Sequence, residues 1–234
     1  MISLNIDTST SYCSTALTHD GDVVCAYRQT QLAHAAVLPL FVQQLLKKAK
    51  EDQLHIDAVA VSKGPGSYTG LRIATATAKG LCYSLHLPLL AIDTLQVLCM
   101  SYLTSTPNTT TDTILCPMID ARRSEVYCAL YNYKADPITQ VEAKVITENS
   151  FREELENNKI IFFGDGADKC KTLITHPNAI FVSDIIPDAA SMGRLAQQAL
   201  LHKRTEDIAY FSPFYLKPYN AVRAENKVLK ELQQ

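Results

Sequence analysis

The order of hydrophobic and polar residues along the chain predicts strands that alternate with amphipathic helices. In the first half, the strand-like runs are short, rich in apolar residues and separated by turn residues; they span residues 2–6, 13–18, 23–28 and 58–61. Asp20-Gly21-Asp22 provides the turn that joins the second run to the third. The pattern therefore predicts an antiparallel hairpin, a third strand beside it and a separate buried strand.

Two helices are predicted in the same half. Over Val37–Glu51 the apolar residues recur with the period of a helix that buries one face, at Leu38, Phe41, Val42, Leu45, Leu46 and Ala49. The second predicted helix, Leu71–Leu85, has Arg72 and Lys79 as its charged residues, and much of its circumference is small or apolar. Such a helix is either enclosed by its own lobe or docks on another chain.

The second half of the chain repeats the pattern of the first. Aligned without a gap, residues 2–17 match residues 115–130, so that Ile6-Asp7 corresponds to Ile119-Asp120. Each copy reads as a strand, a tight turn that begins at the aspartate, and a second strand. The repeat predicts an α/β protein of two similar lobes that face each other.

The polar stretch 105–112 is the natural linker between these lobes. We therefore expect an N-terminal lobe at residues 1–104 and a C-terminal lobe at residues 113–234. A second echo supports the division, because Gly64-Pro65-Gly66 follows a predicted strand in one lobe and Gly164-Asp165-Gly166 follows a predicted strand in the other.

The strongest concentration of glycine joins the strand at 58–61 to the helix at Leu71–Leu85. It reads Gly64-Pro65-Gly66-Ser67-Tyr68-Thr69-Gly70-Leu71-Arg72. Glycine permits a close approach of two backbones, Ser67 or Thr69 can cap the helix, and free N–H groups at the helix start can hold an anion. The segment is not a Walker loop, since no Gly-Lys-Ser/Thr follows, and its glycine spacing is not that of a dinucleotide fingerprint.

This glycine segment resembles the signature of the TsaB family, also called YeaZ, whose members are needed to place threonylcarbamoyl on a tRNA adenosine beside the anticodon. Further segments resemble other parts of the family pattern, in the expected order; they are Ile6-Asp7-Thr8-Ser9-Thr10, Ile92-Asp93-Thr94-Leu95, the stretch from Asp120 to Tyr127, Gly164-Asp165-Gly166-Ala167 and Pro213-Phe214-Tyr215-Leu216-Lys217. Together they cover nearly the whole chain. The resemblance implies an actin-like or Hsp70-like (ASKHA) fold, duplicated into two lobes with mixed sheets and flanking helices.

The resemblance also implies a function. It points to a non-catalytic scaffold and activating subunit that forms a heterodimer with the catalytic paralogue TsaD and is joined by the ATPase TsaE, with tRNA bound only through the complex and a homodimer as an option in isolation. TsaD carries a His-x-x-x-His metal motif, whereas none of the six histidines here lies four residues from another. We therefore expect no catalytic residue, no metal and no cofactor. The alternatives are a nucleotide-dependent kinase or transferase of the same superfold and, last, a metallopeptidase.

Composition narrows the setting of the protein. Hydrophobic residues make up 47% of the chain, charged residues 20%, and the net charge is −2. No global positive field is therefore available to draw nucleic acid, and the basic residues after Lys217 alternate with glutamates. Seven cysteines without a Cys-x-x-Cys pair are typical of reduced core thiols in a cytoplasmic protein. No apolar run is long enough to cross a membrane.

Asp7, Thr8, Ser9 and Thr10 form the first candidate site. In the actin-like superfold the turn at this position holds nucleotide phosphate, and Asp7 would hold a metal-bound water. The turn here lacks the glycine that lets backbone approach phosphate. The alternative is a degenerate site, a capped β-turn whose hydroxyls bond locally.

Asp120, Arg122, Arg123 and Glu125 form the second candidate site, a polar turn in the second lobe. An arginine pair beside carboxylates can clamp an anion or a transition state. The alternative is an ion-pair lattice that locks the hairpin, since no nucleophile or base accompanies the cluster.

The partner surface is the third candidate site. The family resemblance implies that helices of the first lobe pack against TsaD. The small and apolar residues of the two predicted helices are the ones that we expect on this surface: Leu38, Leu45, Leu71, Ala74, Ala78 and Leu81.

Overall fold

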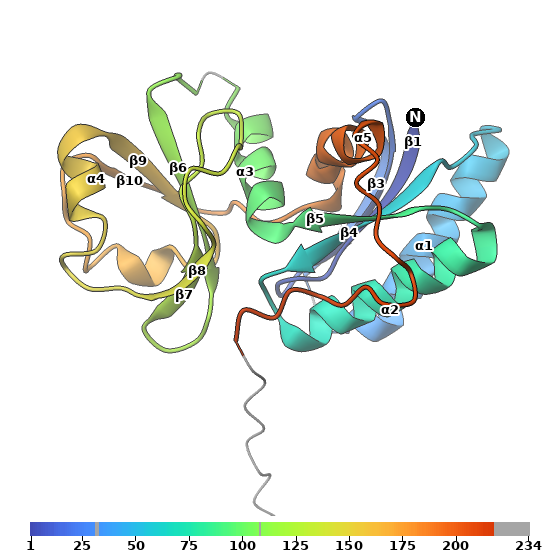
Figure 1. Cartoon of the computed structure of the whole chain (residues 1–234), viewed down its shortest axis with the longest axis horizontal. Coiled ribbons are helices and arrows are strands. Elements are labelled where there is room, and N and C mark those ends of the chain that lie inside the picture. The colour runs from blue at the N-terminus through green and yellow to red at the C-terminus, as the bar shows by residue number, and fades with distance from the viewer. Residues whose placement is uncertain (31–32, 108, 218–234) are drawn as a thin grey trace, which may run out of the picture.

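The chain forms two five-stranded sheets with helices packed between and around them (Figure 1). The computed structural model describes residues 1–30, 33–107 and 109–217, and the structural statements that follow concern these residues. The basic residues expected after Lys217, and the end of the predicted C-terminal lobe, lie outside the described residues.

The first sheet has the strand order β3-β2-β1-β4-β5. Its strands are β1 (Ile2–Asp7), β2 (Cys13–His19), β3 (Asp22–Gln29), β4 (Ala58–Gly64) and β5 (Leu89–Asp93). β1 pairs antiparallel with β2 and parallel with β4. The predicted hairpin, third strand and buried strand are therefore confirmed.

The second sheet repeats this order as β8-β7-β6-β9-β10. Its strands are β6 (Thr113–Asp120), β7 (Glu125–Cys128), β8 (Glu142–Val145), β9 (Lys159–Phe163) and β10 (Ala179–Val182). β6 pairs antiparallel with β7 and parallel with β9, as β1 does with β2 and β4. The duplication predicted from the sequence is confirmed, down to the glycine turn that follows β4 and β9.

Two long helices cover one face of the first sheet. They are α1 (His34–Glu51) and α2 (Tyr68–Leu85), and their apolar faces join β1, β2 and β4 in one core. α2 begins three residues before the predicted start, because the Ser67 hydroxyl accepts a hydrogen bond from the Gly70 N–H at 3.3 Å and caps the helix at Ser67.

The helix α3 (Thr94–Ser105) lies between the two sheets (Figure 1). Val97 packs with β4 and β5 of the first sheet, whereas Leu98 and Tyr102 pack with the second sheet, where the ring of Tyr102 stacks on that of Phe163 at 4.8 Å. Because α3 is buried from two sides, its apolar residues are not confined to one stripe.

The second sheet has its own core on the side away from α3. Phe151 and Leu155, at the short helix α4 (Arg152–Asn157), pack there with Phe162 and with Cys170 of the 3₁₀ helix η1 (Asp168–Cys170). The second lobe thus closes with shorter helices than the first.

The chain then returns to the first lobe. The 3₁₀ helix η2 (Ala189–Met192) and α5 (Gly193–Leu201) pack Met192, Leu195 and Ala196 on the first sheet, opposite α1 and α2. The sequence analysis places this segment in the second lobe, since it follows the second sheet along the chain. The structure instead uses it, together with Val97 of α3, to cover the face of the first sheet opposite α1 and α2.

Candidate functional site

The turn after β1 is built around the Asp7 carboxylate. Its Oδ1 accepts hydrogen bonds from the Ser9 backbone N–H at 3.1 Å and the Ser9 hydroxyl at 3.0 Å, and its Oδ2 accepts one from the Ser62 hydroxyl of β4. Asp7, Thr8 and Ser9 are 0% exposed and Thr10 is 7% exposed. The hydroxyls thus serve the fold of the turn and do not face solvent.

Burial shifts the ionisation of this carboxyl. Removal from water raises the pKa of Asp7 from 3.8 to about 6, and the hydrogen bonds from Ser62 and Ser9 partly offset the shift. The charged form of Asp7 is therefore disfavoured in the folded protein at acidic pH.

The glycine segment, residues 64–70, lies directly on this turn. The Ser67 N–H donates to the Ser9 carbonyl at 2.6 Å, and the Thr8 hydroxyl donates to the Gly70 carbonyl at 2.7 Å. A Cβ at Gly66 would lie 2.4 Å from the Ser9 oxygen, and one at Gly70 would lie 1.9 Å from the Thr8 oxygen. Two of the glycines are therefore required because backbone meets backbone here.

This contact covers the turn at residues 7–10, the first candidate site. The geometry fits the interpretation of residues 7–10 as a capped turn, since every hydroxyl that could face a nucleotide is covered by the chain itself. The end of β4 is held as well: the Gly64 N–H donates to the Thr94 hydroxyl at 3.1 Å. The Asp93-Thr94 motif thus supports the glycine segment from a second side.

Residues 206–217, here named the C-terminal strap, cover the glycine segment from outside. At the start of the strap, the Glu206 N–H donates a hydrogen bond to the Leu89 carbonyl of β5 at 2.9 Å. Further along, the Lys79 ammonium donates to the Ala209 and Phe211 carbonyls at 3.2 and 3.0 Å. Figure 1 shows this red segment running along α2 towards the second lobe. The charge of Lys79 on α2 is thereby used to hold the strap.

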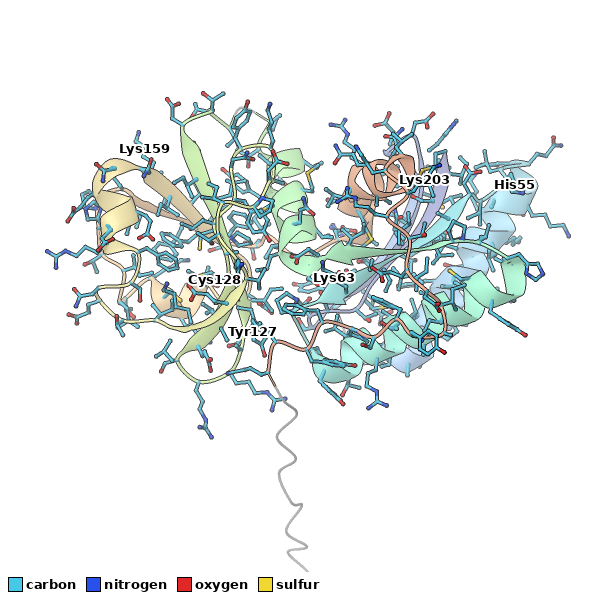
Figure 2. The ribbon with its side chains drawn as sticks, in the orientation of Figure 1. His55, Lys63, Tyr127, Cys128, Lys159 and Lys203 are labelled. Carbon is cyan, nitrogen blue, oxygen red and sulfur yellow. The ribbon has the colours of Figure 1, made fainter. Side chains whose placement is uncertain are left out.

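The strap then reaches the glycine segment and the polar turn of the second lobe. The Phe214 N–H donates to the Lys63 carbonyl at 2.6 Å, and the ring of Tyr215 lies 4.6 Å from that of Tyr68. At its end, Lys217 forms an ion pair with Glu125 of β7. In Figure 2, Lys63 at the end of β4 and Tyr127 on β7 mark the region where the two lobes approach each other.

The polar turn of the second lobe, residues 120–125, is stabilised by Lys169. The Lys169 ammonium donates to the Arg123 and Glu125 carbonyls at 3.0 and 2.7 Å and pairs with the Asp120 carboxylate. The two carboxylates of the turn are therefore both engaged by lysines. The arginine side chains are not part of this lattice, and so the structure agrees with the ion-pair interpretation for Asp120 and Glu125 alone.

The predicted partner surface is corrected by the structure. Five of its six residues, Leu38, Leu45, Leu71, Ala74 and Ala78, are 0–1% exposed and pack inside the first lobe. Leu81 is half-buried against the same core. This side of α2 therefore lacks charged residues because it is buried within the first lobe. A distinct, exposed side of α2 carries Arg72, Ala76, Gly80 and Tyr83.

Sequence reasoning missed three residues of the site. Ser62 is hidden in the apolar run of β4, and Lys169 and Lys217 are ordinary lysines until the fold brings them to the polar turn. For Lys217 a signal existed, because it ends the Pro213–Lys217 motif; for the other two, only the tertiary structure places them.

The described residues also bear on three other features: metal-ligand clusters, reactive cysteines and membrane-spanning helices. There, no group of three or more histidine, cysteine, aspartate and glutamate side chains is placed to hold a metal ion. The seven cysteines are free and all but Cys25 are buried; burial raises the pKa of Cys82 to about 11. Between residues 1 and 217, apart from 31, 32 and 108, no helix is long and apolar enough to cross a membrane.

The duplicated sheets, each with an antiparallel hairpin beside a parallel strand, define a two-lobe protein of the actin-like (ASKHA) class. The family model described as TsaD, tRNA N6-adenosine threonylcarbamoyltransferase, matches residues 28–225. The chain is 30% identical to the tRNA threonylcarbamoyladenosine biosynthesis protein TsaB of Bacillus subtilis, over 93% of this chain and 94% of that protein. It belongs to the TsaB (YeaZ) family.

Further relatives agree. TsaB of Escherichia coli is 27% identical, over 92% of this chain and 94% of its own. Among solved structures, an uncharacterized protein with similarity to peptidase YeaZ from Pseudomonas aeruginosa superposes with a TM-score of 0.79 at 25% identity, over 92% of this chain and 99% of that one. YeaZ from Pseudomonas aeruginosa superposes with a TM-score of 0.73 at 25% identity, with the same coverage.

Gly70→Ala should destabilise the fold, because its methyl group would clash with the Thr8 carbonyl. We expect a loss of about 1–3 kcal/mol in the free energy of unfolding. Gly80→Ala is the matched control on the same helix, where no atom lies within 4 Å of the new Cβ; it should stabilise by about 0.5–1 kcal/mol. Urea unfolding of both variants measures the difference, and equal effects would contradict the close contact.

Asp7 should make stability depend on acidic pH. The folded state keeps a proton that the unfolded state releases between pH 3.8 and about 6, so the free energy of unfolding falls as pH rises through this window and is level above it. The loss is about 3 kcal/mol. In Asp7→Asn this pH-dependent part of the free energy of unfolding is absent, because asparagine does not ionise. Denaturant unfolding of both proteins from pH 4 to pH 7 gives the difference, and a difference independent of pH would contradict the shifted pKa.

Proposed function

We propose that this chain is a scaffold subunit, without catalytic residues of its own, of the complex that places threonylcarbamoyl on tRNA. The family gives the general role, tRNA threonylcarbamoyladenosine biosynthesis, which the names of its TsaB relatives state. The observation that supports a subunit without catalytic residues is the buried Asp7 turn. Its carboxylate and hydroxyls form hydrogen bonds with Ser62, Ser9 and the glycine segment. TsaD would supply the transfer chemistry, and TsaE the ATPase.

The exposed sides of α1 and α2 support docking on TsaD. On α2, a shallow depression is lined by Tyr68, Thr69, Arg72, Ile73 and Ala76. On α1, Leu40 is 58% exposed. Small residues on one helix allow the close approach of another, and an exposed leucine supplies apolar area to bury.

The alternative of a nucleotide-dependent kinase or transferase predicts a binding site at Asp7. Because the glycine segment fills the approach to the turn, we expect no ATP binding by the isolated chain at up to millimolar nucleotide, a bound that corresponds to about −4 kcal/mol. Isothermal titration with Mg·ATP tests this. Micromolar affinity that disappears in Asp7→Asn would favour the kinase or transferase.

Ala76→Glu should abolish docking while the fold survives. Ala76 is exposed, so the fold tolerates the glutamate, but its carboxylate would have to be desolvated at the interface, which would cost a few kcal/mol of binding even beside Arg72, roughly a hundredfold in affinity. Ala78→Glu, by contrast, should fail to fold stably, since Ala78 is 0% exposed. Analytical ultracentrifugation with TsaD, together with tRNA modification by the reconstituted TsaD and TsaE mixture, measures the outcome.

Gln198→Glu provides the matched control, because it adds the same charge to an exposed position of α5 on the other face of the first sheet. It should bind TsaD like the unmodified chain. If Ala76→Glu also binds normally, the interface lies elsewhere; if the isolated chain modifies tRNA without TsaD, the scaffold role is wrong.

A further inference from the structure

Arg122 and Arg123 are the arginines of the polar turn, and both are exposed. In the part of the chain that the structure describes, neither guanidinium forms a hydrogen bond or an ion pair. The nearby carboxylates do not compete for them, since Asp120 is paired with Lys169 and Glu125 with Lys217. Two permanent positive charges are therefore left free at one turn.

The backbone of this turn is held in an unfavourable conformation. Arg122 and Arg123 have φ values of 71° and 54°, in the left-handed region that few residues other than glycine adopt. The turn is nonetheless over-determined: the Arg122 N–H donates to Asp120 Oδ1 at 2.9 Å, and Lys169 holds the Arg123 carbonyl. Consecutive strained residues that are fixed by their surroundings are typical of ligand clamps.

Backbone donors are also free at this turn. The N–H groups of Arg123 and Ser124 have no acceptor among the described residues, whereas the Ala121 and Glu125 N–H groups close the turn on Glu125 and Arg122. Adjacent free amides beside two guanidinium groups form a rigid set of donors suited to a phosphate group.

We infer that the Arg122–Arg123 turn binds backbone phosphate of the substrate tRNA within the assembled complex. A nucleotide held jointly by this turn and the corresponding Asp7 turn is disfavoured as the ligand, because the Asp7 turn is buried. The second turn is open to solvent at the surface, where a polyanion can reach it. The inference rests on the proposed function and adds to it a direct contact between this subunit and RNA.

The test uses the full complex of this chain with TsaD and TsaE, and an unmodified tRNA transcript as the probe. The Arg122→Ala/Arg123→Ala double variant should raise the KM for tRNA roughly tenfold with kcat unchanged. The salt dependence of tRNA binding should become shallower by about one unit for each lost phosphate contact. Arg122→Lys/Arg123→Lys should restore part of the affinity, because the charges return without the planar fork.

Arg204→Ala is the control, since Arg204 is exposed and forms no ion pair among the described residues. Figure 2 places its neighbour Lys203 away from Tyr127 and the polar turn. An unchanged KM and salt slope in the double variant would overturn the inference. Loss of TsaD binding by the folded double variant would also overturn it and make the turn a protein-docking element.

The two proposals can fail separately. If the unmodified complex does not modify tRNA, the proposed function fails, and filter binding of the transcript to complexes with and without the double substitution still decides the inference. If complexes with and without the double arginine substitution modify tRNA equally well, only the inference fails.

Discussion

The contact between the glycine segment and the Asp7 turn organises the first lobe and much of what surrounds it. Backbone meets backbone at Gly66 and Gly70, so the distance between α2 and the end of β1 is set by the absence of two side chains. Because Ser67 both caps α2 and donates to the Ser9 carbonyl, the start of the helix and the turn are one unit. The outer strap can lie flat on this unit for the same reason: a Cβ at Gly64 would be 2.5 Å from the Phe214 oxygen.

That contact also satisfies the polar groups of the Asp7 turn from within the protein. Buried polar groups that lack a hydrogen-bond partner are costly. Here Ser62, Ser9 and the glycine segment satisfy Asp7 and Thr8 internally. The carboxyl still carries a raised pKa, which reflects the remaining cost of enclosing a charge.

The lobes meet through the apolar packing of α3 and through specific polar contacts. α3 contributes apolar area to both sheets. The Tyr131 hydroxyl donates to Asp93 at 3.3 Å, the Gln96 amide donates to the Ala135 carbonyl at 3.0 Å, and Lys217 joins Glu125. The strap thus connects the glycine segment of the first lobe to the polar turn of the second. The Asp7 turn of the first lobe is buried against the glycine segment, whereas the polar turn of the second lobe exposes Arg122 and Arg123.

The sequence by itself determined the strands, the duplication and the glycine segment, because periodicity, repeats and glycine spacing are local signals. It did not determine which side of α2 is buried: Ala74 and Ala78 lie in the core and Ala76 outside, and small residues on both sides conceal the difference. It also could not place α5 on the first sheet, or Lys169 and Lys217 at the polar turn, since these contacts join residues more than forty positions apart. Only the tertiary structure brings such residues together, because long-range packing depends on the whole fold and not on neighbours in the chain.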